Sequence, residues 1–122
     1  HFVGQRTNVP ADLCALDVFV MTSRWEAFSL ALLEAMASGL PIVAAGLPGI
    51  AEAVEENESG FLLPVGDVDG MGAAVEKILS DRALAGRMGA QARRRVEQNF
   101  TRAQMMEKIA RVYNSVCTHV IN

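Results

Sequence analysis

Cysteine and histidine are scarce in this chain of 122 residues, and their scarcity argues against two kinds of site, a metal centre and a disulfide framework. The two cysteines stand near opposite ends of the chain and the two histidines near its termini, so neither type has the spacing of metal ligands. We expect both cysteines to be reduced thiols, and one long-range disulfide between them is the alternative. No apolar run reaches the roughly 18 residues that a membrane span needs.

The shares of hydrophobic residues (51%) and charged residues (20%) are those of a globular protein with a modest core. The chain opens on His1 and the strand-like pair Phe2-Val3, with no initiator methionine and no signal-peptide pattern. We therefore expect a piece of a longer protein whose N-terminal part is missing, folded as a single partial domain over residues 1–122.

Charge is distributed unevenly along the chain. Residues 1–76 carry 2 basic and 11 acidic side chains, whereas residues 77–122 carry 9 basic and 3 acidic ones, which together give the net charge of −3. An acidic whole argues against a general nucleic-acid binder. The basic C-terminal part, including Arg93-Arg94-Arg95, is interpreted as a solvated helix surface, with contact to an anionic membrane or to another domain as the alternatives.

Short apolar runs alternate with helix-like segments in the first half of the chain. The runs at 18–21 and 42–45 are continuously apolar, which is typical of parallel strands that helices cover on both faces. The order indicates a doubly wound α/β fold, with a sheet so short that the missing part should leave an unpaired edge. We predict strands at 2–4, 17–21, 41–45 and 60–63, and helices at about 10–16, 29–38, 49–56, 67–79, 82–98 and 102–116.

After Pro64 the pattern is helical only. Asp67 and the pair Ser80-Asp81 stand at N-cap positions. In the last predicted helix, apolar residues recur at helical spacing and predict a stripe that faces the core. The stripe consists of Met105, Ile109, Val112 and Val116.

The predicted helix at 29–38 contains a carboxylate in an apolar body. Ser29 is a suitable N-cap, and Gly39 with the following proline is a suitable stop. Glu34 lies between them with no basic residue three or four positions away, and a buried carboxylate is costly without a partner. Its partner must therefore be a neighbouring backbone group, Arg6, or a ligand hydroxyl.

The loop at 22–30 joins a predicted strand to this helix, on the side of an open α/β sheet where ligands bind. The backbone N–H groups of Phe28, Ser29 and Leu30 lack helical partners and suit a phosphate, although a water-filled helix cap is the alternative. Glu26 lies in this loop, either in a capping box with Ser23 or facing a ligand.

The distance between the two carboxylates does not favour glycoside hydrolysis. The residues from Glu26 to Glu34 would span about 12 Å as continuous helix, more than the roughly 5–9.5 Å of a glycosidase pair. Two carboxylates on either side of a phosphate-binding helix start instead suggest a ligand with hydroxyls at both ends, a nucleotide sugar. Trp25 beside them is expected to pack near the loop, with stacking on a base or sugar as the alternative.

The segment EAFSLALLE at 26–34 resembles the E-x7-E motif of the retaining GT-B glycosyltransferases of family 4. The likeness continues through ADLCALDVFVMTS before the motif and through EAMASGLPIVAAGLPGIAEAV, GFLLPVGD and KILSDRALAGRMGAQARRRVEQNFT after it, and so covers nearly the whole chain. The resemblance implies a Rossmann-like GT-B C-terminal half-domain that binds the sugar donor.

The resemblance also implies roles for matching positions. Glu26 would be the catalytic-site carboxylate that accepts hydrogen bonds from donor-sugar hydroxyls, and Glu34 would accept them from the ribose. The backbone amides of Phe28, Ser29 and Leu30, next to Ala27, would hold the diphosphate or the sugar. No metal, other cofactor or enzymatic nucleophile is expected, so positioning and charge stabilisation would carry the rate.

Three departures from the family pattern affect this expectation. Ala27 and Ser29 replace the usual glycines, and the G-G-x-P-E stretch reads Pro48-Gly49-Ile50-Ala51-Glu52. The family's Arg and Lys that neutralise the diphosphate, and its acceptor-binding domain, would precede this chain. We therefore expect the piece to be inactive alone and to partner the missing domain, with a homodimer as another option.

Other functions compete with this one. A sugar-nucleotide epimerase of the same fold is disfavoured by the full motif, and a non-catalytic nucleotide-sugar-binding or interaction module is the alternative from another class. A Rossmann dehydrogenase is disfavoured because no G-x-G-x-x-G follows a strand. The expected location is the cytoplasm, with a peripheral position at the inner face of the membrane as an option.

Overall fold

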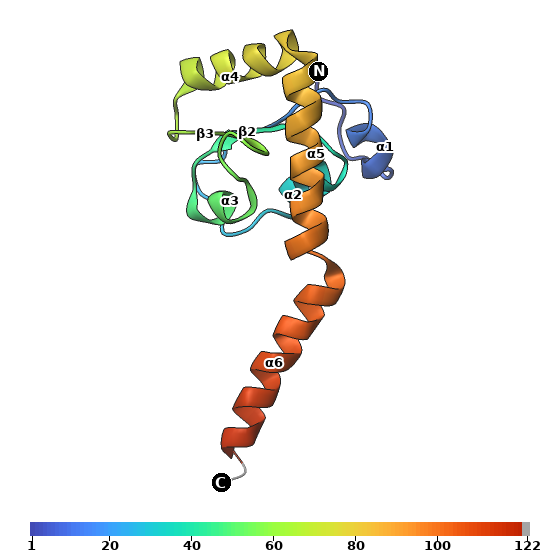
Figure 1. Ribbon diagram of the computed structural model, residues 1–122, viewed down its shortest axis with the longest axis vertical. Helices are drawn as coiled ribbons and strands as arrows, with labels where there is room; N and C mark the ends of the chain where they lie inside the picture. The colour runs from blue at the N-terminus through green and yellow to red at the C-terminus, as the bar shows by residue number, and fades with distance from the viewer. Residues whose placement is uncertain (121–122) are drawn as a thin grey trace.

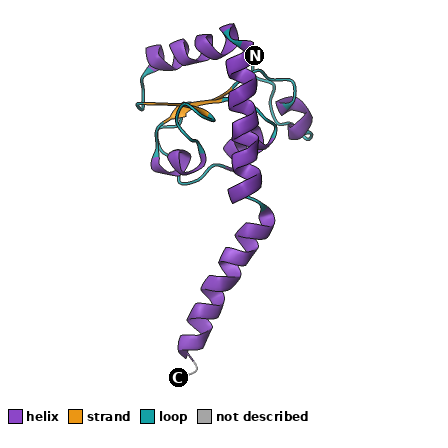
Figure 2. Ribbon diagram, viewed as in Figure 1, coloured by secondary structure: helices purple, strands orange, loops and turns teal. Residues whose placement is uncertain are grey.

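The computed structural model describes residues 1–120, with side chains through residue 117, as a short parallel sheet between helices (Figure 2). The sheet has three strands in the order β1-β2-β3, and every pairing is parallel. The elements follow the order α1 (Val9–Leu13), β1 (Phe19–Met21), α2 (Leu30–Ala37), β2 (Ile42–Ala45), α3 (Pro48–Ala53), β3 (Gly60–Leu63), α4 (Val68–Ser80), α5 (Arg82–Asn99) and α6 (Arg102–Val120).

The central strand β2 is buried at all four positions, so it must be covered on both faces. Ile42 and Ala44 belong to a cluster with α1, α2, α3 and the second half of α5. Val43 and Ala45 belong to a second cluster with α4 and the first half of α5. Figure 1 shows α5 running from α4, past the sheet, to the side of α2 and α3. This confirms the predicted α/β architecture with helices on both faces.

Side-chain caps fix the starts of three helices. The Ser29 hydroxyl accepts from the Leu32 N–H at the start of α2. Asp67 caps α4 and Asp81 caps α5 in the same way. Gly39 follows α2 with φ at +79°, the left-handed conformation that ends many helices. For these three helices, α2, α4 and α5, the observed bounds agree with the predicted ones within one residue.

The predicted first strand is absent, and the strand at 17–21 is shorter than predicted. Phe2-Val3-Gly4 is exposed and pairs with no strand of the described chain. β1 covers only Phe19–Met21, and Val20 is exposed because β1 lies at the edge of the sheet. A continuous apolar run therefore indicated burial correctly for β2 and wrongly for β1. Two helices also end early, α1 at Leu13 and α3 at Ala53.

The apolar stripe of α6 does not face the core, which corrects the prediction. Figure 1 shows α6 extending away from the sheet and its helices. The helical spacing of these apolar residues predicted the helix correctly. Along most of α6, however, no described element lies close enough to cover the stripe. Its members Met105, Ile109, Val112 and Val116 are all exposed.

Two exposed ion pairs shift pKa values without contributing much stability. Arg6 donates hydrogen bonds to the Asp12 carboxylate at 2.8 and 2.9 Å, which lowers the pKa of Asp12 and raises that of Arg6. The stabilisation is present above the ordinary pKa of aspartate and is lost as the pH falls through the lowered value. A hydrogen bond to Glu97 raises the pKa of Arg93 in the same way.

The crossing of α2 and α5 depends on one glycine and supplies a matched test. A Cβ at Gly89 would lie 2.0 Å from the Gly39 carbonyl oxygen, whereas a Cβ at Gly86, on the same helix, would meet nothing within 4 Å. We expect Gly89→Ala to destabilise the fold by about 1–3 kcal/mol through overpacking. Gly86→Ala should stabilise it by roughly 0.5–1 kcal/mol through helix propensity. Urea unfolding followed by circular dichroism measures the free energy of unfolding of both variants. Equal stabilities of the two variants would contradict the close contact between Gly89 and Gly39.

Candidate functional site

The carboxyl end of β1 leads into a loop at residues 22–29 and then into α2. Ser29 is buried, and its hydroxyl and carbonyl oxygens accept from the N–H groups of Leu32 and Leu33. The N–H groups of Phe28, Ser29 and Leu30 donate to no acceptor among the described residues. These donors, at the positive end of an eight-residue helix, are suited to an anionic oxygen.

Glu34 lies on the exposed side of α2, which corrects the expectation of a buried carboxylate. The helix buries Leu32, Ala35 and Met36, and it turns Leu30 and Glu34 to solvent. The apolar residues around Glu34 in the sequence had suggested burial, but helical spacing places it on the outer face. Within the described chain, no group pairs with the Glu34 carboxylate.

Arg6 is not the partner of Glu34, because both of its bonds go to Asp12. The backbone alternative is wrong as well, because the Ser38 hydroxyl and N–H both donate to the Glu34 carbonyl and no described backbone group donates to its carboxylate. Because Glu34 is exposed, water can solvate its carboxylate and no protein partner is required.

Glu26 is half-buried in the loop, and its neighbourhood is shaped by α3. A Cβ at Gly49 would lie 1.7 Å from the Ala27 carbonyl oxygen and 3.1 Å from that of Glu26. Only glycine allows the start of α3 to approach the loop backbone this closely. The capping-box interpretation with Ser23 is wrong, because the helix begins at Leu30 and not after Ser23.

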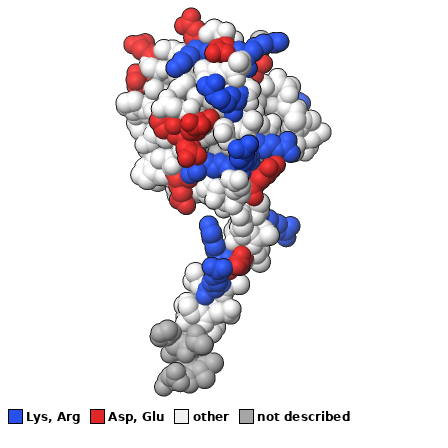
Figure 3. Space-filling view, in the orientation of Figure 1, with Lys and Arg blue, Asp and Glu red and all other residues white. Residues whose placement is uncertain are grey.

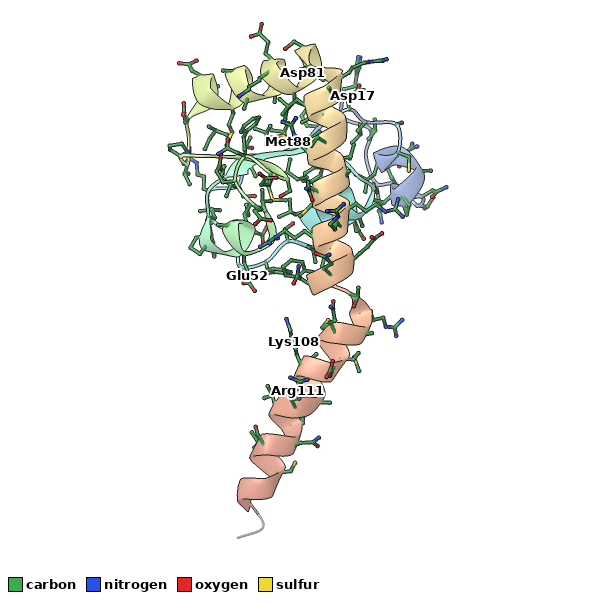
Figure 4. All side chains as sticks on the ribbon, viewed as in Figure 1. Asp17, Glu52, Asp81, Met88, Lys108 and Arg111 are labelled. Atoms are coloured by element: carbon green, nitrogen blue, oxygen red, sulfur yellow. The ribbon has the colours of Figure 1, made fainter. Side chains whose placement is uncertain are left out.

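An apolar groove of about 650 Å³ adjoins the start of α2. The ring of Phe28 contacts that of Phe100 at the α5–α6 turn, with centroids 5.6 Å apart. Glu52 of α3 and Lys108 of α6 also line the groove. Figure 4 shows both between α6 and the part of the molecule that contains the sheet. The site loop thus touches the turn between the last two helices.

Trp25 is not packed beside the loop, which corrects the prediction. Its side chain is 87% exposed, next to Glu26. It is the only tryptophan of the chain, so its environment can be followed by fluorescence.

The interpretation of Arg93-Arg94-Arg95 as a solvated surface holds for Arg93 and Arg94 but is wrong for Arg95. Figure 3 shows basic side chains gathered over α5 with acidic ones beside them. Arg95 instead donates to the backbone carbonyls of Ala53 and Glu52, at 2.6 and 3.0 Å. Its spacing of three and seven residues from buried Ala92 and Met88 was a signal that it faces inward.

Three further features bear on disulfides, metal binding and membrane insertion. Cys14 and Cys117 are free thiols in the structure. In the part of the chain that the structure describes, no three His, Cys, Asp or Glu side chains gather as metal ligands. Among the same residues, no helix combines the length and hydrophobicity needed to cross a bilayer.

Residues 1–95 match the family described as glycosyl transferases group 1. The lipopolysaccharide core biosynthesis mannosyltransferase of Rhizobium meliloti is 38% identical over 117 residues, which cover 94% of this chain and 33% of that protein. The N-acetyl-alpha-D-glucosaminyl L-malate synthase of Bacillus anthracis is 33% identical over 94% of this chain and 30% of its own length. The chain thus spans about a third of the length of the curated relatives it matches.

Solved structures show the same fold. Anabaena HepE, in complex with UDP and glucose, matches with a TM-score of 0.88 and 28% identity over 93% of this chain and 31% of that one. The same protein was also solved with UDP-glucose. The structure matches GT-B glycosyltransferase structures, in agreement with the fold expected from the sequence.

The exposure of Trp25 predicts that its removal leaves the fold intact. We expect Trp25→Ala to change the free energy of unfolding by less than about 0.5 kcal/mol, as for other surface positions. Leu32→Ala, in the buried face of the following helix, should cost about 2–5 kcal/mol and serves as the contrast. Denaturant unfolding measures both, and a loss at Trp25 comparable to that at Leu32 would show that the ring packs.

Proposed function

The chain belongs to the family of glycosyl transferases group 1, and we propose that it binds the donor, a nucleotide-diphosphate sugar, for a retaining glycosyltransferase. The relatives are named as enzymes that transfer or join sugars, and the HepE neighbour was solved with UDP-glucose. Because the chain spans a third of the curated relatives, the transfer reaction is proposed for the protein that carries it. The acceptor would bind to a further domain.

The observation that carries the proposal is the arrangement around the start of α2. Free backbone N–H groups at residues 28–30 lie between Glu26 in the loop and Glu34 on the exposed face of the helix. Glu34 comes little more than one helical turn, about 6 Å, after Leu30. A diphosphate at the helix start would therefore place its nucleoside and its sugar within reach of different carboxylates.

Each part of the site has one proposed role. The amides of Phe28, Ser29 and Leu30, beside Ala27, bind the diphosphate and stabilise charge that develops on the leaving phosphate. Glu34 accepts hydrogen bonds from the ribose hydroxyls, and Glu26 accepts them from hydroxyls of the transferred sugar. Holding the sugar carbon against the acceptor hydroxyl lowers the barrier by orientation.

The proposal extends to conditions that the family resemblance implies. Transfer retains the anomeric configuration and needs no metal or other cofactor. The reaction takes place in the cytoplasm or at the inner face of its membrane. The chain works together with an acceptor-binding domain and is inactive without it; association through the exposed face of α6 is the other partnership considered.

The two carboxylates should separate in their effects. We expect Glu34→Gln to weaken UDP binding about tenfold, because it removes the negative charge of the carboxylate that accepts hydrogen bonds from the ribose hydroxyls. Glu26→Gln should leave UDP affinity within about twofold and lower kcat/KM for sugar transfer by about 100-fold. Isothermal titration with UDP and a steady-state transfer assay measure the two effects.

Glu76→Gln, an exposed glutamate on α4, is the matched control and should change neither quantity. A folded Glu34→Gln protein with unchanged UDP affinity would contradict the ribose assignment.

Turnover separates the enzyme from a non-catalytic binding module. We expect the protein that carries this chain to transfer sugar from one class of UDP-, GDP- or ADP-sugar, at a rate that EDTA leaves unchanged. Nuclear magnetic resonance of the product would show the retained anomeric configuration. Binding of nucleotide sugars without turnover, with any acceptor offered, would favour the module instead.

A further inference from the structure

The short helix α3 is held at its C-terminal end by a side chain from α5. Arg95 Nε donates to the Ala53 carbonyl at 2.6 Å, and one terminal nitrogen donates to the Glu52 carbonyl at 3.0 Å. Its other terminal nitrogen reaches the Glu55 carboxylate at 3.3 Å. The guanidinium therefore binds two carbonyls at the negative end of the helix dipole, and its side chain is only 28% exposed.

The other end of α3 lies against the backbone of the candidate site. Gly49, in the first turn, approaches the Ala27 carbonyl so closely that a Cβ there would be 1.7 Å from its oxygen. The peptide that links Ala27 to Phe28 therefore rests on α3, and the peptide that links Glu26 to Ala27 lies next to it. Any shift of α3 along its axis must move this peptide or open a gap beside it.

Alone, α3 is too short to fix its own position. It has six residues, and neither its N-cap, Leu47, nor its C-cap, Val54, provides a side-chain cap. Isolated helices of this length are unstable in water, so the surroundings decide where it lies. Ile50 and Ala53 bury one face in the core, and the two ends are fixed by Gly49 and Arg95.

We propose that Arg95 is a positioning residue, which through α3 sets the place of Glu26 and thereby the recognition of the sugar part of the donor. This rests on the proposed function. Arg95 contacts no ligand itself in this account. The Phe28 N–H belongs to the peptide that rests on α3, but the other donors for the nucleotide part, the amides at the start of α2, and the Glu34 carboxylate do not touch it. Nucleotide binding should therefore respond less to a shift of α3 than recognition of the sugar does.

The test compares Arg95→Gln with Arg93→Gln in the protein that carries this chain. Arg93 lies two residues away and, among the described residues, pairs only with Glu97 on its own helix. For Arg95→Gln we expect UDP affinity lowered by no more than about threefold and kcat/KM for sugar transfer lowered about 10- to 100-fold, the effect of a small misplacement. Arg93→Gln should match wild type in both.

Two further variants distinguish positioning from general destabilisation. Arg95→Lys keeps the charge but cannot bind two carbonyls with a planar fork, so it should recover part of the lost kcat/KM. Gly49→Ala disturbs the contact between α3 and the site loop directly, at the other end of α3, because its Cβ would lie against the Ala27 carbonyl. If both residues act through α3, the double variant Gly49→Ala, Arg95→Gln should lose less kcat/KM than the product of the single losses.

A measurement without ligand decides the positional claim even if the donor assignment fails. The backbone amide signals of Ala27 and Phe28 should shift in Arg95→Gln and stay in place in Arg93→Gln. Unmoved signals, or equal losses of UDP affinity and of transfer, would overturn the positioning role. A wild-type protein that binds no nucleotide sugar would overturn the proposed function and the sugar-recognition part of this inference, whereas the amide signals would still decide whether Arg95 places the loop.

Discussion

The full burial of β2 is the constraint on which the rest of the structure depends. Alternate residues of this strand point to opposite faces, so Ile42 and Val43 need separate hydrophobic covers. The first cover comes from α1, α2 and α3, the second from α4, and α5 contributes to both. The connections that place these helices cross the carboxyl edge of the sheet. The loop before α2 lies on this edge because it leads from the carboxyl end of β1 to α2, and α2 covers one face of β2.

Local signals in the sequence predicted the elements that carry their own start, stop and packing face. The cap at Ser29, the left-handed Gly39 and the apolar run of β2 act over a few residues and are visible without a structure. Elements that need a distant partner were predicted less well. Phe2-Val3 lies beside no strand of the described chain, and the stripe of α6 meets no core, although both have the right periodicity.

The candidate site divides in the same way. The helix start and the two carboxylates could be found from spacing, but the sequence did not tell which side of α2 carries Glu34. Its exposure removes the cost of a buried charge and leaves the carboxylate accessible to a ligand. The contacts of Gly49 and Arg95 join residues far apart in the chain, so no local pattern could show that Gly49 meets the site loop or that Arg95 holds α3.

The central claim is that a nucleotide diphosphate binds at the start of α2. Titration of isotope-labelled protein with UDP, followed by amide chemical shifts, tests it most directly. The account predicts that the signals of residues 28–30 move most, because their N–H groups would donate to the phosphates. Saturation with UDP that leaves these signals in place, or moves those at the starts of α4 or α5 instead, would contradict it.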